Sequence, residues 1–278
     1  ISEHPASDSL HSDMRHYNLQ QLDGLMDNLK GRRLQLDKST CPQAMYDLID
    51  GHQIDICFAP DPTILLKAQK NQTEMAGMQQ AHMLDAIAYC SFWKWFEEYE
   101  FGCGNSDAFL TESELGQRLS NFRALQTGYL CDSFAAIVGF NENGAIVHYR
   151  AEAGSDAIIQ ADGTLLIDSG AHYECGTTDV TRCFAFGTPS PAAIKANTIV
   201  LAAHLTLSNT PFPAGTNGVQ LDAICRQILW QNQMDYGHGT GHGVGHVLSV
   251  HEGPASLSKR GYQEILKDMV LSNEPGYY

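Results

Sequence analysis

Glycine occupies every second position from Gly237 to Gly245, and this stretch limits what the chain can fold into more than any other. Glycine destabilises helices, so no helix is expected here. A residue without a side chain also lets the backbone approach other atoms closely. His238, His242 and His246 stand between or beside these glycines, so the close approach involves imidazole groups. Without a helix, the spacing of His238 and His242 is not that of a helical zinc-binding pair.

The overall composition is that of an ordinary globular protein. The chain has 278 residues, of which 43% are hydrophobic and 18% charged. A net charge of −15 disfavours a nucleic acid or an anionic membrane surface as the main partner. No apolar run approaches the ~18 residues that a membrane span needs. These features are typical of a cytoplasmic enzyme, and we expect that location.

Eight cysteines are scattered along the chain, and no two of them have the C-x-x-C spacing. This pattern argues against both a disulfide framework and a thiolate zinc site. We expect reduced and mostly buried thiols.

Capping signals and hydrophobic periodicity predict several helices. A long helix follows Asn71 and Glu74, with a core stripe of Met75, Met78, His82, Ala86, Tyr89, Trp93 and Phe96. Further helices are expected over 22–29, after Thr111 and Ser190, and over 219–230. Strands are expected over 33–36, 54–58, 134–140, 164–168, 179–186, 244–250 and 269–272.

The order of these elements lacks the regular βαβ alternation of a parallel sheet, so the predicted class is α+β. Residues 1–65 are interpreted as the remainder of an α/β domain. The sequence contains no phosphate-binding loop, no G-x-G-x-x-G and no G-x-S-x-G motif. The sequence therefore excludes a nucleotide-binding loop of these types and the nucleophile elbow of the serine hydrolases.

Two aspartates bracket a predicted hairpin. Asp168 ends one apolar strand and Asp179 opens the next. A turn centred near Tyr173 and Glu174 would place the two carboxylates directly opposite each other, with Cβ atoms ~5 Å apart. Such a pair stays ionised only with a cation between its members. Taken alone, the pair favours a simpler interpretation, in which two strand-end aspartates solvate their turns.

The histidines and a later glutamate change that interpretation. His251 and Glu252 lie in the sequence V-H-E-G-P, and Glu274 lies in N-E-P-G-Y-Y. One histidine is commonly a core residue, but several histidines together with an aspartate pair and a turn glutamate are hard to explain as packing. The residues therefore indicate a metal site.

From about Asp61 to Tyr278 the chain resembles aminopeptidase P, the Xaa-Pro aminopeptidases of the pita-bread metallopeptidase family M24. The resemblance rests on K-A-Q-K-N, I-V-H-Y, I-D-S-G-A, T-T-D-V-T-R, H-G-T-G-H-G-V-G, V-H-E-G-P and N-E-P-G-Y-Y in that order. It implies a pita-bread catalytic domain over 66–278, incomplete at its C-terminus. Residues 1–65 resemble the tail of the family's smaller creatinase-like N-terminal domain.

The resemblance also implies a site. Asp168 would chelate one divalent ion, Asp179 would bridge two, and His242 and Glu274 would complete the ligands in this chain. Glu274 would also handle the proton of the attacking water. His148, His238 and His251 would hold substrate and stabilise the tetrahedral intermediate, and Thr181 and Arg182 would support Asp179. Manganese suits a carboxylate-rich site with one imidazole.

The family has a fifth ligand, a bridging glutamate that would lie beyond Tyr278. We therefore expect a chain trimmed at both ends. The implied reaction is hydrolysis of the bond between an N-terminal residue and a following proline. Family members are commonly dimers or larger homo-oligomers, and we expect the same here.

Two alternatives remain. A prolidase-like dipeptidase on the same fold would cleave only dipeptides. A catalytically inactive pita-bread module would bind peptides without cleaving them. Metal content separates the second alternative from an enzyme.

Overall fold

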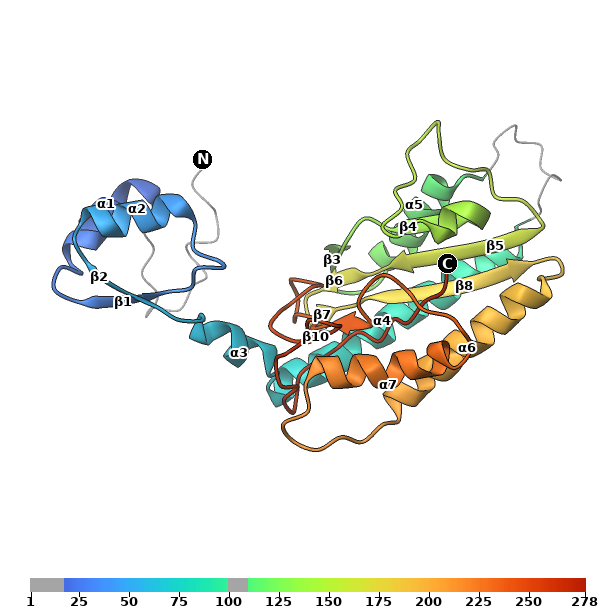
Figure 1. The fold of residues 1–278 in the computed structure, drawn as a ribbon. Helices are drawn as coiled ribbons and strands as arrows, with labels where there is room; N and C mark the ends of the chain where they lie inside the picture. Colours follow the sequence, from blue (N-terminus) through green and yellow to red (C-terminus); the bar gives the residue numbers. More distant parts are fainter. Residues whose placement is uncertain (1–17, 100–109) are drawn as a thin grey trace. The chain divides into compact units, whose positions relative to one another are not determined.

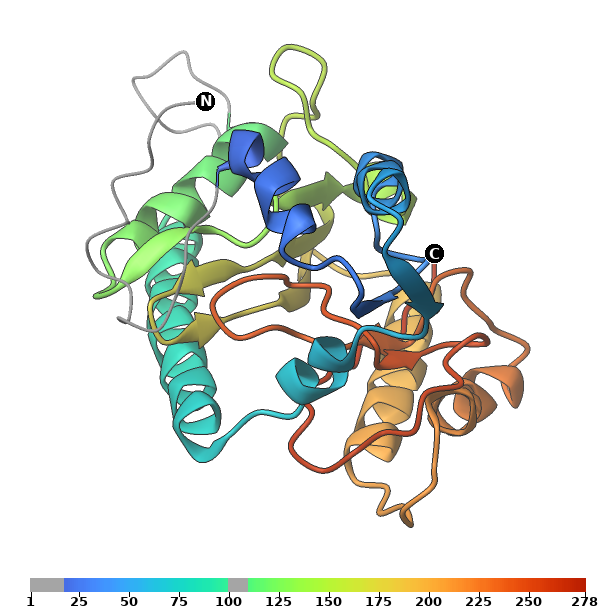
Figure 2. The same ribbon diagram turned by 90° about the vertical axis from the view of Figure 1, so that its left-hand side faces the viewer.

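The computed structural model describes residues 18–99 and 110–278 (Figures 1 and 2). Predictions on residues 1–17 and on Cys103 lie outside the described residues. The chain divides into two compact units, Ile1–Thr63 and Ile64–Tyr278, which we describe separately. Among the described residues, no helix has both the length and the apolar character needed to cross a membrane.

The first unit is built around a β-α-β arrangement. Its elements are η2 (Leu19–Gln21), α1 (Leu22–Asp27), β1 (Arg33–Leu36), α2 (Gln43–Gly51) and β2 (Asp55–Phe58). Strands β1 and β2 pair in parallel, and α2 forms the connection between them. Met26, Ile49 and Ile54 form its buried core. These elements agree with the expected helix over 22–29 and with both expected strands. Helix α3 (Pro62–Ala68) spans the division between the units.

The second unit mixes helices with antiparallel strands, which agrees with the α+β class. Its elements are α4 (Gln72–Glu97), α5 (Glu112–Ala124), β3 (Tyr129–Asp132), β4 (Ile137–Phe140), η3 (Asn141–Ala145), β5 (Gly163–Ser169), β6 (Ala171–Tyr173), β7 (Gly176–Thr177), β8 (Val180–Phe186), α6 (Pro191–Ser208), α7 (Gly218–Trp230), β9 (Gly241–His242) and β10 (Ser256–Leu257). The strand orders are β4-β5-β8, β3-β6-β7 and β10-β9. Helices α4 and α5 pack together, and so do α6 and α7 (Figure 1).

The helices begin where their capping residues predict. Asn71 and Thr111 each accept a hydrogen bond from the backbone N–H three residues later, and Glu74 and Glu114 complete the two capping boxes. Ser190 caps α6, whose first residue is proline. These local contacts satisfy backbone N–H groups that the helix itself leaves unpaired, which is why the sequence reveals them.

The buried face of α4 differs from the predicted stripe. The buried residues are Met78, Ala81, Asp85, Ala88, Phe92 and Phe96, whereas His82 and Ala86 are exposed. Phe92 and Phe96 pack with Leu119 and Ile167 in the largest core cluster. Met78 and Phe96 of the predicted stripe are buried, and Tyr89 and Trp93 pack against the core. The prediction was wrong at His82 and Ala86, and it missed Asp85, which looks like a surface residue. In the fold it is buried against the guanidinium of Arg123, with Nε–Oδ1 at 2.8 Å.

Two predicted strands are wrong. After Gly243 the chain turns back, with the N–H of Gly245 bonded to Ser249 O and with positive φ angles at Val247 and Ser249. The expected strand over 244–250 is therefore a loop. The expected strand over 269–272 makes only isolated bridges, of which one joins Leu271 to Gly243.

The expectation of mostly buried thiols is also wrong. All described cysteines are free, but only Cys225 is buried, and Cys90, Cys131 and Cys183 are exposed. Cys131 and Cys183 lie on the edge strands β3 and β8 of their sheets. Edge strands leave part of their residues uncovered, and the cysteine pattern does not reveal which strands are edges.

Candidate metal centre

A hairpin built from β5 to β8 brings Asp168 and Asp179 to one side of the sheet, but not opposite each other. Asp168 pairs with Thr181, and Asp179 lies one residue before β8. The pairing of Tyr173 with Gly176 places the turn at residues 174 and 175, one residue later than predicted. The register therefore shifts by two positions. Because side chains alternate with a period of two, Asp179 remains a diagonal neighbour on the face of Asp168.

Three of the four predicted ligands meet in one cluster. His242 Nε2 lies 3.3 Å from Asp179 Oδ2 and 3.2 Å from Glu274 Oε1. One potential ligand atom from each residue lies within 4.8 Å of the others. His242 belongs to β9, while Asp179 precedes β8 and Glu274 follows in the C-terminal segment. The cluster thus joins segments that are far apart in the sequence.

Asp168 is the fourth predicted ligand, and its environment calls for a cation. Its Oδ1 atom is buried without a hydrogen-bond partner in the described part of the chain. Burial raises the pKa of Asp168 to about 7, and the charges of Asp179 and Glu274 add to this effect, although a hydrogen bond from Thr181 opposes it. A buried carboxylate beside two others favours a bound cation or a proton.

His242 is oriented for ligation through Nε2. Its Nδ1 lies 2.9 Å from Gly243 O. Because a carbonyl oxygen only accepts, Nδ1 carries a proton and Nε2 faces the carboxylates. Burial lowers the pKa of His242, but the contacts with Asp179 and Glu274 outweigh it and raise the pKa to about 10. The protonated imidazole thus occupies a place where the donor set fits a divalent ion.

Glu274 is held by two hydrogen bonds. Its Oε1 accepts from Ser272 Oγ at 2.7 Å, and its backbone N–H donates to Thr240 O. Burial raises the pKa of Glu274, yet His242 and Ser272 outweigh that effect, so the pKa lies below its usual value. The carboxylate is therefore ionised and fixed beside His242.

Two of the alternating glycines allow the close approach between backbone segments that the sequence predicted. A Cβ on Gly241 would lie 2.1 Å from Ser272 O, and one on Gly243 would lie 2.1 Å from Glu252 O. At Gly237, by contrast, a Cβ would meet open space. Gly241 and Gly243 are thus required by close backbone contacts on both sides of His242.

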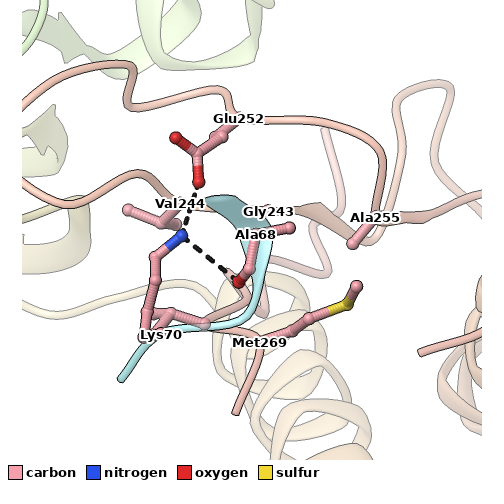
Figure 3. Close-up of a pocket in the computed structure, with 8 residues that line it drawn as sticks. Ala68, Lys70, Gly243, Val244, Glu252, Ala255 and Met269 are labelled. Carbon is pink, nitrogen blue, oxygen red and sulfur yellow. Dashed lines mark hydrogen bonds and ion pairs between the residues drawn. The ribbon is translucent and has the colours of Figure 1, made fainter. Parts of the chain in front are cut away.

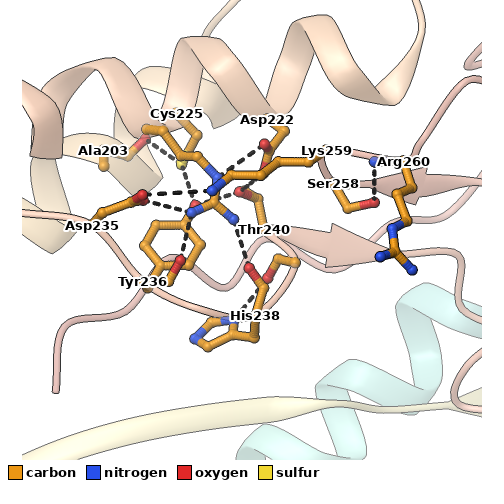
Figure 4. Close-up of polar contacts among 12 residues, drawn as sticks. Ala203, Asp222, Cys225, Asp235, Tyr236, His238, Thr240, Ser258, Lys259 and Arg260 are labelled. Carbon is orange, nitrogen blue, oxygen red and sulfur yellow. Dashed lines mark hydrogen bonds and ion pairs between the residues drawn. The ribbon is translucent and has the colours of Figure 1, made fainter.

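The buried side chain of Arg226 fixes the start of the glycine-rich segment. The sequence alone did not indicate this role of Arg226. Its guanidinium donates to Tyr236 O at 2.7 Å and to His238 O at 2.6 Å. Asp222 and Asp235 accept its other hydrogen bonds (Figure 4). The only signal was the i, i+4 spacing of Asp222 and Arg226 on the buried face of α7.

The three predicted substrate-binding histidines differ in their contacts and in their exposure. His238 Nε2 is 2.9 Å from Tyr278 Oη, and His238 contributes to lowering the pKa of Glu274. The ring of His251 lies 4.2 Å from that of His242, at 71°. Burial and the charge of His242 lower the pKa of His251, although the charges of Asp179 and Glu274 oppose this shift. His148 is exposed, with a φ of 58°.

Thr181 and Arg182 do not support Asp179 as expected. Thr181 pairs with Asp168 in the ladder. Arg182 follows on the alternate face of β8, where it lines a groove with Tyr89 and Trp93 of α4. Its Nη1 donates to Thr181 O.

Two further buried charges hold the neighbouring segments. Glu112 accepts from Tyr149 Oη at 2.8 Å and from the N–H groups of Phe140 and Ala157, so it ties down the segment that carries His148. Asp85 binds Arg123 and accepts from Tyr173 Oη at 3.0 Å, which holds the hairpin. Both contacts join residues distant in the sequence, so spacing could not reveal them.

The chain is similar to known proteins in sequence and in fold. Metallopeptidase family M24 matches residues 76–278. Aminopeptidase P2 of Arabidopsis thaliana is 43% identical over 223 residues, which cover 80% of this chain and 31% of the plant protein. Xaa-Pro aminopeptidase 1 of Dictyostelium discoideum is 43% identical over 221 residues, 78% of this chain and 35% of that protein. The chain thus spans about a third of the length of these curated relatives.

Among solved structures, X-prolyl aminopeptidase from Caenorhabditis elegans has a TM-score of 0.83 and 34% sequence identity. The match covers 93% of this chain and 42% of that chain. The nematode protein is described as a cytosolic enzyme with a di-nuclear active site. This likeness confirms the expected α+β, pita-bread fold.

Proposed function

The chain belongs to metallopeptidase family M24, and from that membership we propose that it is part of a metal-dependent aminopeptidase. Its reaction is hydrolysis of the bond between an N-terminal residue and a following proline. The observation that carries the proposal is the convergence of Asp179, His242 and Glu274 next to the buried, unpartnered oxygen of Asp168. The names of the Arabidopsis and Dictyostelium relatives support the substrate class.

The donor set fits two divalent ions. Asp168, Asp179, His242 and Glu274 would hold them, with a further bridging glutamate beyond Tyr278. Bound there, the ions would acidify a water molecule and polarise the scissile carbonyl. Manganese is the metal we propose, because three carboxylates and one imidazole form a hard donor set.

The side chains have separate tasks in the proposed reaction. Glu274, which Ser272 orients, takes the proton of the attacking water and returns it to the leaving nitrogen. His251 and His148 donate hydrogen bonds to the developing oxyanion, an interaction that is typically worth about 3 kcal/mol. His238, which contacts Tyr278, holds the substrate. Proline fixes φ and lacks an N–H, so a shaped pocket can select it.

We also propose a location, an oligomeric state and a domain division for the enzyme. We place it in the cytoplasm, as the nematode relative is described as a cytosolic enzyme. We propose a homodimer or larger homo-oligomer, to be tested by light scattering. Residues 1–65 would be the remainder of a creatinase-like domain and residues 66–278 part of the catalytic domain.

The proposal is tested by comparing peptides of different length. The full-length protein with Mn²⁺ is given an Xaa-Pro dipeptide and an Xaa-Pro-Yaa tripeptide, and metal content is measured in parallel. Release of the first residue from the tripeptide supports an aminopeptidase. Cleavage of the dipeptide alone would favour a prolidase-like enzyme. Bound metal without cleavage of either peptide would contradict both activities, and the absence of both metal and cleavage would favour a peptide-binding module.

A further inference from the structure

Two charged residues of the sequence motifs have no task in the proposed reaction, and the fold joins them. Lys70 lies in K-A-Q-K-N before α4, and Glu252 follows His251 in V-H-E-G-P. Lys70 Nζ lies 2.5 Å from Glu252 Oε1 (Figure 3). The two side chains are only 2% and 7% exposed, so this is a buried ion pair.

Lys70 is fully bonded. Besides Glu252, its ammonium group donates to Lys67 O at 3.1 Å and to Ala68 O at 3.3 Å. An ammonium group has three protons, and each of them has an acceptor here. The backbone N–H of Lys70 donates to Asp268 O. The position of the charge is therefore set from several directions.

Lys67 provides a comparison within the same site. Its Nζ lies 2.9 Å from Glu252 Oε2, but its side chain is 58% exposed. Water solvates the exposed ammonium group of Lys67, which weakens its contribution to the pair. Glu252 thus contacts two lysines of equal charge, of which only one is buried.

Glu252 connects this pair to His242 through one carbonyl oxygen. The backbone N–H of Glu252 donates to Gly243 O at 2.7 Å. The same oxygen accepts from His242 Nδ1 at 2.9 Å. A Cβ on Gly245 would lie 3.0 Å from Glu252 Oε2, so the carboxylate has little room to move toward that residue. A shift of Glu252 would move both the acceptor that orients His242 and the adjacent His251.

We propose that Lys70 is a positioning residue: through its buried pair with Glu252 it sets the orientation of His242 and the place of His251. The effect on metal binding is independent of the substrate, whereas the effect on catalysis rests on the proposed function. Lys70 itself touches neither the cluster of ligands nor the proposed attacking water. Outer contacts of this kind typically contribute 10- to 100-fold to metal affinity or activity.

The test compares two lysines that contact one carboxylate. In the full-length protein, Lys70→Met and the double variant Lys70→Met/Glu252→Gln are set against Lys67→Met. The double variant removes both buried charges, so it remains informative where Lys70→Met alone fails to fold. The readouts are the dissociation constant of Mn²⁺ by titration calorimetry, the thermal midpoint, and kcat and KM for an Xaa-Pro-Yaa peptide.

We expect Mn²⁺ affinity to fall at least 10-fold in the folded Lys70 variants, and kcat to fall with KM for the peptide within about twofold. Lys67→Met should stay within about twofold of the unchanged protein in affinity. A folded double variant with unchanged affinity would overturn the inference, and so would an equal loss in Lys67→Met. If the unchanged protein binds Mn²⁺ but cleaves no peptide, the proposed function fails, and the affinities alone still decide the role of Lys70.

Discussion

At the level of single residues, the candidate centre gathers side chains whose pKa values depart from their usual range. Asp168, Asp179 and Glu274 place three carboxyl groups around His242. The pKa of Asp168 is raised to about 7 by burial and by its charged neighbours, and that of His242 to about 10 by Asp179 and Glu274, against the effect of burial. A divalent ion has to displace these protons, because a ligand binds metal in its deprotonated form.

The first prediction is that metal binding releases protons. At pH 7 His242 is protonated and Asp168 about half protonated, so about one to two protons should leave per site filled. A proton competes with the ion at Asp168 up to a pKa of about 7 and at His242 up to a pKa of about 10, so apparent affinity should rise as pH rises from 6 to 9. Calorimetry in buffers of different ionisation enthalpy measures the proton count. Release of no protons at pH 7 would contradict the described state of the cluster.

The second prediction concerns Arg226. Arg226→Met leaves Asp222 buried without its charged partner and frees the carbonyls of Tyr236 and His238. Loss of one member of a buried ion pair typically lowers the free energy of unfolding by about 3–5 kcal/mol. Arg260 is exposed, and its guanidinium lies apart from this cluster (Figure 4), so Arg260→Met should change the free energy of unfolding by less than about 0.5 kcal/mol. Denaturant unfolding measures the free energy of unfolding of both variants. Equal losses in the two variants would contradict the role of Arg226 as the buried partner of Asp222.

The sequence revealed the candidate ligands but not the residues that hold them. Asp179, His242 and Glu274 were found because motif order marks them, and the structure brings them together. Arg226, Glu112 and Lys70 were missed as supports, because each acts through partners that only the fold brings near. A buried charge looks like a surface charge until its partner is known.

Among the elements, the glycine-rich segment depends on contacts between backbones. Gly241 and Gly243 sit beside carbonyl oxygens of Ser272 and Glu252, on either side of the ligand His242. A methyl group at either position would push these segments apart. The elements that carry the ligands are therefore coupled by close packing rather than by a regular sheet.

The third prediction follows from this packing. Gly243→Ala places a Cβ 2.1 Å from Glu252 O, so the backbone has to shift. Overpacking of this kind typically lowers the free energy of unfolding by about 1–3 kcal/mol. Gly237→Ala meets open space and should be neutral or slightly stabilising, by less than about 1 kcal/mol. Thermal unfolding of the two variants compares them, and a neutral Gly243→Ala would contradict the described contact.

Elements with local signals were predicted well, and those set by distant contacts were not. Helices α4, α5 and α6 begin at their capping residues because a cap is made by neighbours in sequence. The hairpin register was wrong by two positions, since alternation fixes the face of a strand but not its partner. The strand predicted over 244–250 was wrong, because the alternating glycines reflect close approach to other loops and not the alternation of a strand.

For the whole molecule, the centre exists only when distant segments are in place. Its candidate ligands Asp179, His242 and Glu274 come from distant segments, and the proposed support Lys70 lies far before them in the sequence. An unfolded chain cannot gather this set, so an ion held by it would bind the folded state preferentially. Metal binding at this site would therefore be linked to folding of the second unit.

The fourth prediction is that chelation lowers thermal stability. At a free Mn²⁺ concentration 100 times the dissociation constant, binding adds about 2.7 kcal/mol. For a unit of this size, that should raise the thermal midpoint by about 5–10 °C. Differential scanning calorimetry with Mn²⁺ and with excess chelator measures this shift of the midpoint. A sample with Mg²⁺ in place of Mn²⁺ serves as the control. Identical midpoints would mean that the cluster holds no ion tightly.

The most direct test of the account is peptide cleavage by the full-length protein loaded with Mn²⁺. Release of the first residue is compared between Xaa-Pro-Yaa and Xaa-Ala-Yaa tripeptides, each with and without a chelator. The account predicts fast cleavage of the proline peptide alone, abolished by the chelator and by Asp179→Asn. Metal-loaded protein that cleaves neither peptide, or cleaves both at equal rates with chelator present, would contradict it.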